Sequence, residues 1–234
     1  MTIITMHQPN YLPWIGLFSK VMQTECFVIM DTFKYTRHGV THRNKIRTNA
    51  GSCYLTIPIN KEFTMTNINN VALPQNKGWR EIHWKSIYQN YVKTDFFKDH
   101  SNYFEKLYKQ DFHYLWQLNM DIIHYMLKSF EINVEIIMAS DLNIETNLKH
   151  TDMIIAILKN IGANIYLSGP SGRNYLELGK FSQNNCNCKF VKFTHPVYKQ
   201  RYPGFEPNLS AIDLLFNVGP QSGQVIKDSG SIEN

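Results

Sequence analysis

The chain has 234 residues, of which 43% are hydrophobic and 13% aromatic, so it can bury a substantial core, which excludes a largely disordered protein. Its formal net charge is only +5 and no dense run of Lys and Arg occurs, which argues against nucleic acid as a partner and permits an anionic small substrate. No stretch approaches the roughly 18 apolar residues of a membrane span, no secretory signal is visible, and four cysteines without a Cys-x-x-Cys pair predict reduced thiols in a cytoplasmic protein.

The N-terminal part predicts two buried strands joined by a helix. Residues 2–6 and 26–30 are apolar runs of strand length, and apolar residues recur at helical spacing over 14–23. A strand, a short helix and a second strand in this order predict a right-handed βαβ unit with parallel strands.

The middle of the chain predicts a hairpin followed by helices. Residues 45–47 and 54–59 flank the turn sequence Asn49-Ala50-Gly51-Ser52. Helical stretches are expected at 78–91 and 102–130. Together they are interpreted as a helical insertion, residues 78–130, packed on the sheet.

The C-terminal part continues the alternation of strands and helices. Strands are expected at 134–138, 164–167 and 190–194, and helices at 150–160 and 208–216. Thr151 or Asn147 would cap the first of these helices. The pattern predicts an α/β fold with a mainly parallel sheet, Rossmann-like or nucleotidyltransferase-like, in a single domain over residues 1–220 with a flexible polar tail at 221–234.

Polar side chains follow three of the predicted strands, at the sheet edge where ligands usually bind in α/β folds. His7, Gln8 and Asn10 follow the first strand, in a turn stiffened by prolines, and Asp31 follows the second. The third group is the loop Ser168-Gly169-Pro170-Ser171-Gly172-Arg173. Its glycines permit close approach to a ligand, and the Gly172 N–H and the Arg173 guanidinium suit an anion. The substrate-binding candidates of this loop are Ser168, Ser171, Gly172 and Arg173. Taken alone, the glycines are explained somewhat better by a tight strand-to-helix turn.

The sequence THRNKIRT, residues 41–48, is a second candidate for holding phosphate. As one arm of a hairpin it would place Arg43, Lys45 and Arg47 on the same side, and Asn44 completes the candidate set. A solvated edge strand protected by charge is the alternative explanation.

Two histidines, His7 and His195, each come just after a predicted strand. A neutral histidine near pH 7 suits general acid–base catalysis, although a lone histidine is more often structural. Convergence of both histidines with Arg173 would favour an enzyme, and scatter would favour a binding protein. The remaining histidines show no metal-ligand spacing, so no metal site is predicted.

The chain resembles the WbqC-like family of bacterial proteins over nearly its whole length. The resemblance rests on HQPNYLPWIGLFSKV, VIMDTFKYTRHGVTHRNKIRT, YLTIPI, YLSGPSGRNYL and FTHPVYKQRYPGFEPNLSAIDLLFNVGP, in that order. It implies a role in surface polysaccharide synthesis, notably of O-antigen, where some members are linked with amino sugars that carry an amino-acid or acyl substituent.

A weaker resemblance is to the nucleotidylyltransferase and pantothenate-synthetase superfamily. Trp14-Ile15-Gly16-Leu17 keeps the glycine of that family's His-x-Gly-His motif but neither histidine, and the Ser168–Arg173 loop is similar to its later serine and arginine loop. This resemblance implies ATP, with Mg²⁺, and adenylation of a carboxylate that is then transferred to an amine.

Two functions are therefore expected, of different classes. The first is an enzyme that N-acylates a nucleotide-linked amino sugar, as a transferase or an amide-forming ligase, with an ATP-dependent glycyl or aminoacyl transfer as its most concrete form. His7 and His195 would assist proton transfer, and the basic residues would bind phosphate groups. The second is a non-catalytic protein that binds the same nucleotide-linked sugar in an assembly of that pathway.

Overall fold

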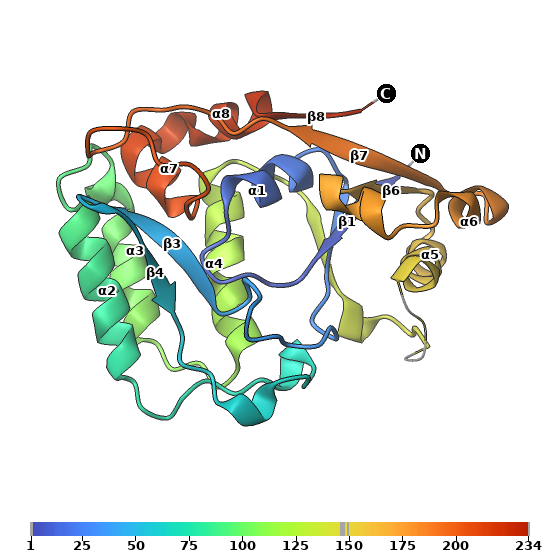
Figure 1. Cartoon of the computed structure of the whole chain (residues 1–234), viewed down its shortest axis with the longest axis horizontal. Coiled ribbons are helices and arrows are strands. Elements are labelled where there is room, and N and C mark those ends of the chain that lie inside the picture. Colours follow the sequence, from blue (N-terminus) through green and yellow to red (C-terminus); the bar gives the residue numbers. More distant parts are fainter. Residues whose placement is uncertain (1, 146–147, 149, 234) are drawn as a thin grey trace.

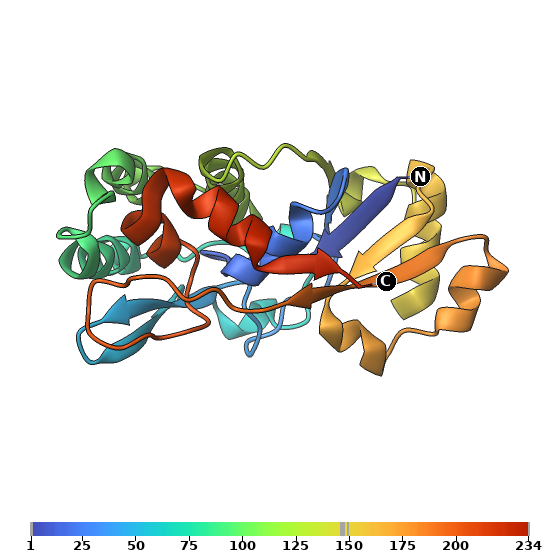
Figure 2. The ribbon, with the colours of Figure 1, turned by 90° about the horizontal axis from the view of Figure 1, so that it is seen from above.

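A mainly parallel six-stranded sheet organises the chain, of which the computed structural model describes residues 2–145, 148 and 150–233 (Figures 1 and 2). The strands are β1 (Ile3–His7), β2 (Cys26–Ile29), β5 (Glu135–Met138), β6 (Ile165–Ser168), β7 (Asn187–Phe193) and β8 (Gly230–Ile232). They lie in the order β5-β2-β1-β6-β7-β8, with β8 alone antiparallel to its neighbour. Numbered along the chain, the five parallel strands have the order 3-2-1-4-5 of a Rossmann-type sheet, which confirms the predicted α/β class.

The two faces of the sheet pack on different helices. Side chains alternate along a strand, so Ile4 and Met6 of β1 enter a core with α5 (His150–Ile161) and α6 (Leu178–Gln183). Phe27 and Ile29 of β2 point to the other face, where α1 (Ile15–Val21) lies. All seven residues of α1 are buried, so this helix is enclosed on every side.

The segment between β2 and β5 forms the second part of the molecule, seen on the left of Figure 1. It holds the hairpin β3 (Arg43–Thr48) and β4 (Gly51–Thr56) and the helices α2 (Gly78–Tyr91), α3 (Phe97–Lys109) and α4 (Leu115–Ser129). The single helical stretch expected at 102–130 is wrong, because the chain leaves the helix between Lys109 and Leu115. There the Arg80 guanidinium donates a hydrogen bond to the Gln110 carbonyl at 2.6 Å. The Leu73 N–H donates to the His113 carbonyl at 2.9 Å.

The C-terminal part is ordered by packing. It forms α7 (Ile212–Val218), α8 (Ser222–Asp228) and β8, so the flexible tail expected from residue 221 is wrong for the described residues up to 233. Ile226 is fully buried, and β8 pairs with β7 through Val191↔Ile232. The remaining short elements are 3₁₀ turns at Lys61–Phe63, Ile68–Asn70, Ala139–Asp141, Pro170–Asn174 and Gly219–Gln221.

Of the two residues expected to cap α5, Asn147 lies outside the described residues. The Thr151 hydroxyl instead accepts a hydrogen bond from the Glu177 N–H at 3.1 Å. It therefore connects α5 to the segment before α6.

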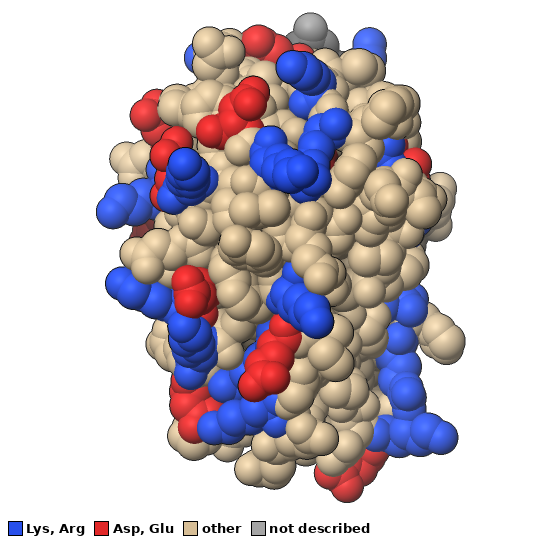
Figure 3. All heavy atoms as spheres, turned by 90° about the vertical axis from the view of Figure 1, so that its left-hand side faces the viewer, with Lys and Arg blue, Asp and Glu red and all other residues tan. Residues whose placement is uncertain are grey.

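The end of the molecule that carries α2 and α3 is covered with mixed charge. Figure 3 shows Lys and Arg interspersed with Asp and Glu on this face. Three ion pairs of the described residues lie on or beside these elements: Lys77–Asp111 at 2.8 Å, Arg80–Asp111 at 3.5 Å and Lys109–Glu105 at 2.5 Å. The two lysine pairs are exposed and add little to stability.

Candidate functional site

The sheet opens between β1 and β6, where the strand order reverses. The β1–β2 pairing continues to His7↔Ile29, but the β1–β6 pairing includes only Ile3↔Ile165 and Ile4↔Tyr166. Beyond Ile4, main-chain carbonyls at the gap accept hydrogen bonds from side chains instead of from the neighbouring strand. The Thr5 hydroxyl donates to the Leu167 carbonyl at 2.9 Å, and the Lys20 ammonium donates to the Met6 carbonyl at 3.1 Å. Ligands of open α/β sheets bind at such a switch point.

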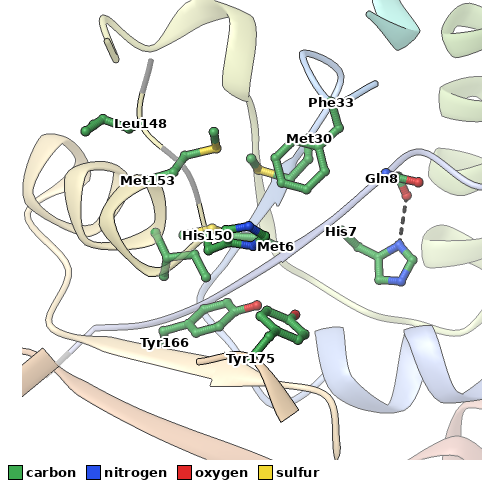
Figure 4. A pocket seen from close by; sticks show the side chains of 11 residues that line it. Met6, His7, Gln8, Met30, Phe33, Leu148, His150, Met153, Tyr166 and Tyr175 are labelled. Atoms are coloured by element: carbon green, nitrogen blue, oxygen red, sulfur yellow. Dashed lines mark hydrogen bonds between the residues drawn. The ribbon is translucent and has the colours of Figure 1, made fainter. Parts of the chain in front are cut away.

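Two cavities adjoin this opening. The outer cavity, of about 690 Å³, is lined by Met6, His7, Gln8, Met30, Phe33, Leu148, His150, Met153, Ile154, Tyr166 and Tyr175. Figure 4 shows the rings of Tyr166 and Tyr175 on one side of it and Met30 and Phe33 on the other. Most of these side chains are apolar or aromatic, which suits the ring of a base or the apolar face of a sugar.

The inner cavity, of about 270 Å³, lies on the α1 side of the sheet. It is lined by Met6, His7, Trp14, Gly16, Leu17, Lys20, Tyr166, Ser168, Gly169, Pro170, Ser171, Tyr175, Val191 and Phe193. Four residues, Met6, His7, Tyr166 and Tyr175, line both cavities. The two cavities therefore meet at the end of β1.

His7 is held as a neutral imidazole at this meeting point. Its Nδ1 lies 2.9 Å from the Gln8 carbonyl, which can only accept, so Nδ1 carries the proton and Nε2 carries the lone pair. Burial, and secondarily the positive charge of Lys20, lower the pKa of His7 to about 4. Near pH 7 His7 is thus able to accept a proton at Nε2.

Lys20 is a buried cation beside His7. It comes from the enclosed helix α1, its side chain reaches back to the Met6 carbonyl, and it forms no ion pair with any acidic group in the described part of the chain. Burial lowers the pKa of Lys20 to about 8. At neutral pH the ammonium is still mostly protonated and gives the inner cavity a positive potential.

Two glycines shape the inner cavity. A Cβ on Gly16 would lie 2.3 Å from the ring of Trp14, so the glycine lets this ring lie across the start of α1. A Cβ on Gly172 would lie 2.1 Å from the Ser168 hydroxyl. Gly172 is therefore required for packing of the loop against the end of β6.

The end of β6 and the loop after it bring two serines to the inner cavity, but not the predicted cation. Ser168 and Ser171 line the inner cavity. The Gly172 N–H donates to the Gly169 carbonyl at 3.0 Å, and Arg173 is paired with Glu233 beside β8. The Arg173 guanidinium also lies 4.0 Å from the centre of the Phe190 ring. The contacts of Gly172 and Arg173 hold the loop in place.

The basic hairpin does not present its three cations together. Arg47 is buried and donates to the carbonyls of Thr48, Gly51, Pro203 and Gly204. Arg43 donates to the His38 carbonyl at 3.1 Å, and both Arg43 and Lys45 lie over the Tyr54 ring. Asn44 donates to the Leu12 carbonyl. None of these four candidates lines either cavity.

The other polar residues at the strand ends differ in their contacts. Gln8 lines the outer cavity and accepts from the Thr41 hydroxyl at 3.3 Å. Asn10 is buried, and its amide has no hydrogen-bond partner among the described residues. The Asp31 carboxylate accepts the Ser140 N–H at 3.0 Å and the Asn69 amide at 3.4 Å.

His195 does not join His7. Its Nε2 accepts the Asn208 N–H at 3.1 Å, so its Nδ1 is protonated and donates to the Pro196 carbonyl at 2.9 Å. Both ring nitrogens hold the loop between β7 and α7, and His195 lines neither cavity.

Sequence reasoning missed Lys20, Tyr166 and Tyr175. Tyr166 lies in the strand predicted at 164–167 and Tyr175 follows the loop after it, and both belong to the quoted segment YLSGPSGRNYL, which was their available signal. Lys20 had one available signal: it stands in a short, otherwise apolar helix directly after a strand that ends in polar residues. Lysine is almost never fully buried unless it is paired, so a lysine on a helix that is buried on all sides indicates a polar partner or ligand for its ammonium.

Comparisons with known proteins identify the family of the chain. The model of the WbqC-like protein family matches residues 8–225. A protein of Mycobacterium tuberculosis, described as "Uncharacterized protein Rv1507c", is 26% identical over 229 residues, which span 97% of this chain and 98% of that protein. No solved structure matches. Within the described residues no helix is long and apolar enough to cross a bilayer. Since the family model covers almost the entire chain, the protein belongs to the WbqC-like protein family.

Proposed function

We propose that this protein is an enzyme that N-acylates an amino sugar carried on a nucleotide, in the synthesis of a bacterial surface polysaccharide. The observation that carries the proposal is the meeting of two cavities at His7. A transfer reaction has two reactants, which must reach one catalytic group from separate sites. The outer cavity suits ring systems, and the inner cavity suits an anion.

His7 is the general base in this proposal. The amine nitrogen attacks the acyl carbonyl, a C–N bond forms, the bond to the leaving group breaks, and the amine proton passes to Nε2 of His7. In the free protein His7 is a weak base, because its pKa is about 4. An anionic substrate bound beside His7 and Lys20 would raise the pKa of both groups. Substrate binding would thus strengthen the base at the moment that it is needed.

ATP remains part of the proposal as a co-substrate. It would supply an acyl-adenylate when the acyl donor is a free amino acid. Lys20, with Ser168 and Ser171 beside it, fits one phosphate group, whether that group belongs to ATP or to the nucleotide-linked sugar. The described residues that line the inner cavity include no carboxylate, so Mg²⁺ would be held through phosphate oxygens and water.

The test is a search for product by mass spectrometry. The protein is incubated with a panel of UDP-, dTDP- and GDP-linked amino sugars, together with either ATP and amino acids or acyl-coenzyme A. We expect one sugar to gain the mass of one acyl group, and we expect His7→Gln to abolish that gain. Lys128→Met, an exposed substitution on α4, is the control that leaves turnover unchanged.

Two results would contradict the proposal. No product across the whole panel, with nucleotide sugar still bound in calorimetry, would identify the non-catalytic binding protein instead. Product formed at an unchanged rate by His7→Gln would remove His7 as the base. His195 and Arg173 do not join His7, and that scatter is the arrangement expected of a binding protein. The proposed enzyme therefore depends on His7 and Lys20 alone, and this test decides between the two classes.

A further inference from the structure

Lys20 has too few partners for a buried ammonium. The residue is 6% exposed, and the Met6 carbonyl at 3.1 Å is the one hydrogen-bond acceptor of its ammonium among the described residues. An ammonium has three N–H donors, and taking its charge out of water is unfavourable unless an opposite charge compensates. The described residues supply no such charge within salt-bridge distance.

Lys20 lies beside a cavity in which a bound group could accept its unused donors. Lys20 lines the inner cavity, and of the described residues around that cavity it is the one with a formal positive charge. Ser168 and Ser171 line the same cavity. The Ser168 hydroxyl donates to the Gly169 carbonyl at 3.1 Å, which leaves its oxygen able to accept.

The strand pairing explains why the ammonium sits at this position. The His7 carbonyl accepts from Met30 N–H on the β2 side, so by the alternation of a parallel ladder the Met6 carbonyl faces the β6 side. There β6 has already separated from β1. The Lys20 ammonium therefore sits in the gap of the switch point, where nucleotide phosphates bind in Rossmann-type sheets.

The cations predicted from the sequence are committed elsewhere. Arg47 and Arg43 donate to main-chain carbonyls, and Arg173 is paired with Glu233. Among the described residues, Lys20 is therefore the cation that lines the inner cavity.

We propose that Lys20, assisted by the hydroxyls of Ser168 and Ser171, is the receptor for a phosphoryl group of the nucleotide, bound in the inner cavity at the β1–β6 switch point. The identification of the ligand as a nucleotide rests on the proposed function. The anion site itself rests on the cavity and on the uncompensated charge.

Calorimetric titration with pyrophosphate, UDP and uridine tests this assignment without any turnover. We expect Lys20→Met to weaken pyrophosphate and UDP binding by about 10- to 100-fold, the equivalent of one charge-assisted hydrogen bond. Uridine has no phosphate, so its weaker binding should be the same in Lys20→Met and the wild type. Lys128→Met is the matched control, and Lys45→Met tests the hairpin as the alternative phosphate site.

A second variant keeps the test decisive if Lys20→Met does not fold. Lys20→Gln retains a donor for the Met6 carbonyl but has no charge, and it should show the same loss of pyrophosphate and UDP binding. Unchanged binding in the folded Lys20 variants, or a loss confined to Lys45→Met, would overturn the assignment. Absence of acyl transfer would count against the proposed function only, because binding of pyrophosphate and UDP does not require it.

Discussion

Replacing Lys20 by methionine should make the unliganded protein more stable, which is unusual for a buried side chain. Burial lowers the pKa of Lys20 from 10.5 to about 8, and that difference corresponds to about 3 kcal/mol of unfavourable free energy at pH 7. Methionine fills a similar volume and removes this cost. Against this, the Met6 carbonyl loses its donor, at about 1 kcal/mol. The net gain is about 2 kcal/mol.

Thermal unfolding measures this gain directly. For a chain of this length about 2 kcal/mol raises Tm by roughly 4–8 °C. The pH dependence is a second signature. The pKa of Lys20 is lower in the folded state than in the unfolded state, so between pH 8 and 10.5 the unfolded wild type binds more protons and wild-type stability rises with pH. The advantage of Lys20→Met should therefore shrink across that interval.

A purely structural lysine would behave in the opposite way. If the bond to the Met6 carbonyl were the reason for Lys20, Lys20→Met would unfold at a lower temperature than the wild type. A lower Tm at pH 7, or a difference between the two proteins that is constant from pH 7 to 10, would refute the reasoning.

Three further predictions use other buried groups. His7→Gln should lower turnover about a hundred- to ten-thousand-fold, the usual contribution of a positioned base, while calorimetric binding of UDP stays within a few-fold of the wild type; normal turnover would exclude the role. Arg47→Ala should cost about 3 kcal/mol or more in urea unfolding, because four carbonyls lose a buried charged donor, and a change below about 1 kcal/mol would show that these bonds matter little. Stability should fall as the pH drops from 6.5 to 4, since burial lowers the pKa of both His42 and His83 to about 4 and the unfolded state binds protons first. His83→Gln should reduce that pH slope, and an unchanged slope would exclude His83 as a contributor.

The sequence by itself determined the fold class and the position of His7. Apolar runs such as CFVIM, separated by helical periodicity, predict buried parallel strands because such strands are covered on both faces. A polar residue directly after such a run must lie at the carboxyl edge of the sheet. His7 could therefore be placed at the site from local pattern alone.

Tertiary structure decided which residues complete the site. Arg47 and Arg173 looked available, but their partners Pro203 and Glu233 are remote in sequence and leave no local signal. The polar tail predicted to be flexible became α8 and β8, because main-chain pairing with β7 requires no side-chain pattern. Lys20 belongs to the candidate site only because β1 and β6 separate beside it. The strand order that opens this gap depends on contacts between distant segments, and periodicity within a segment does not encode it.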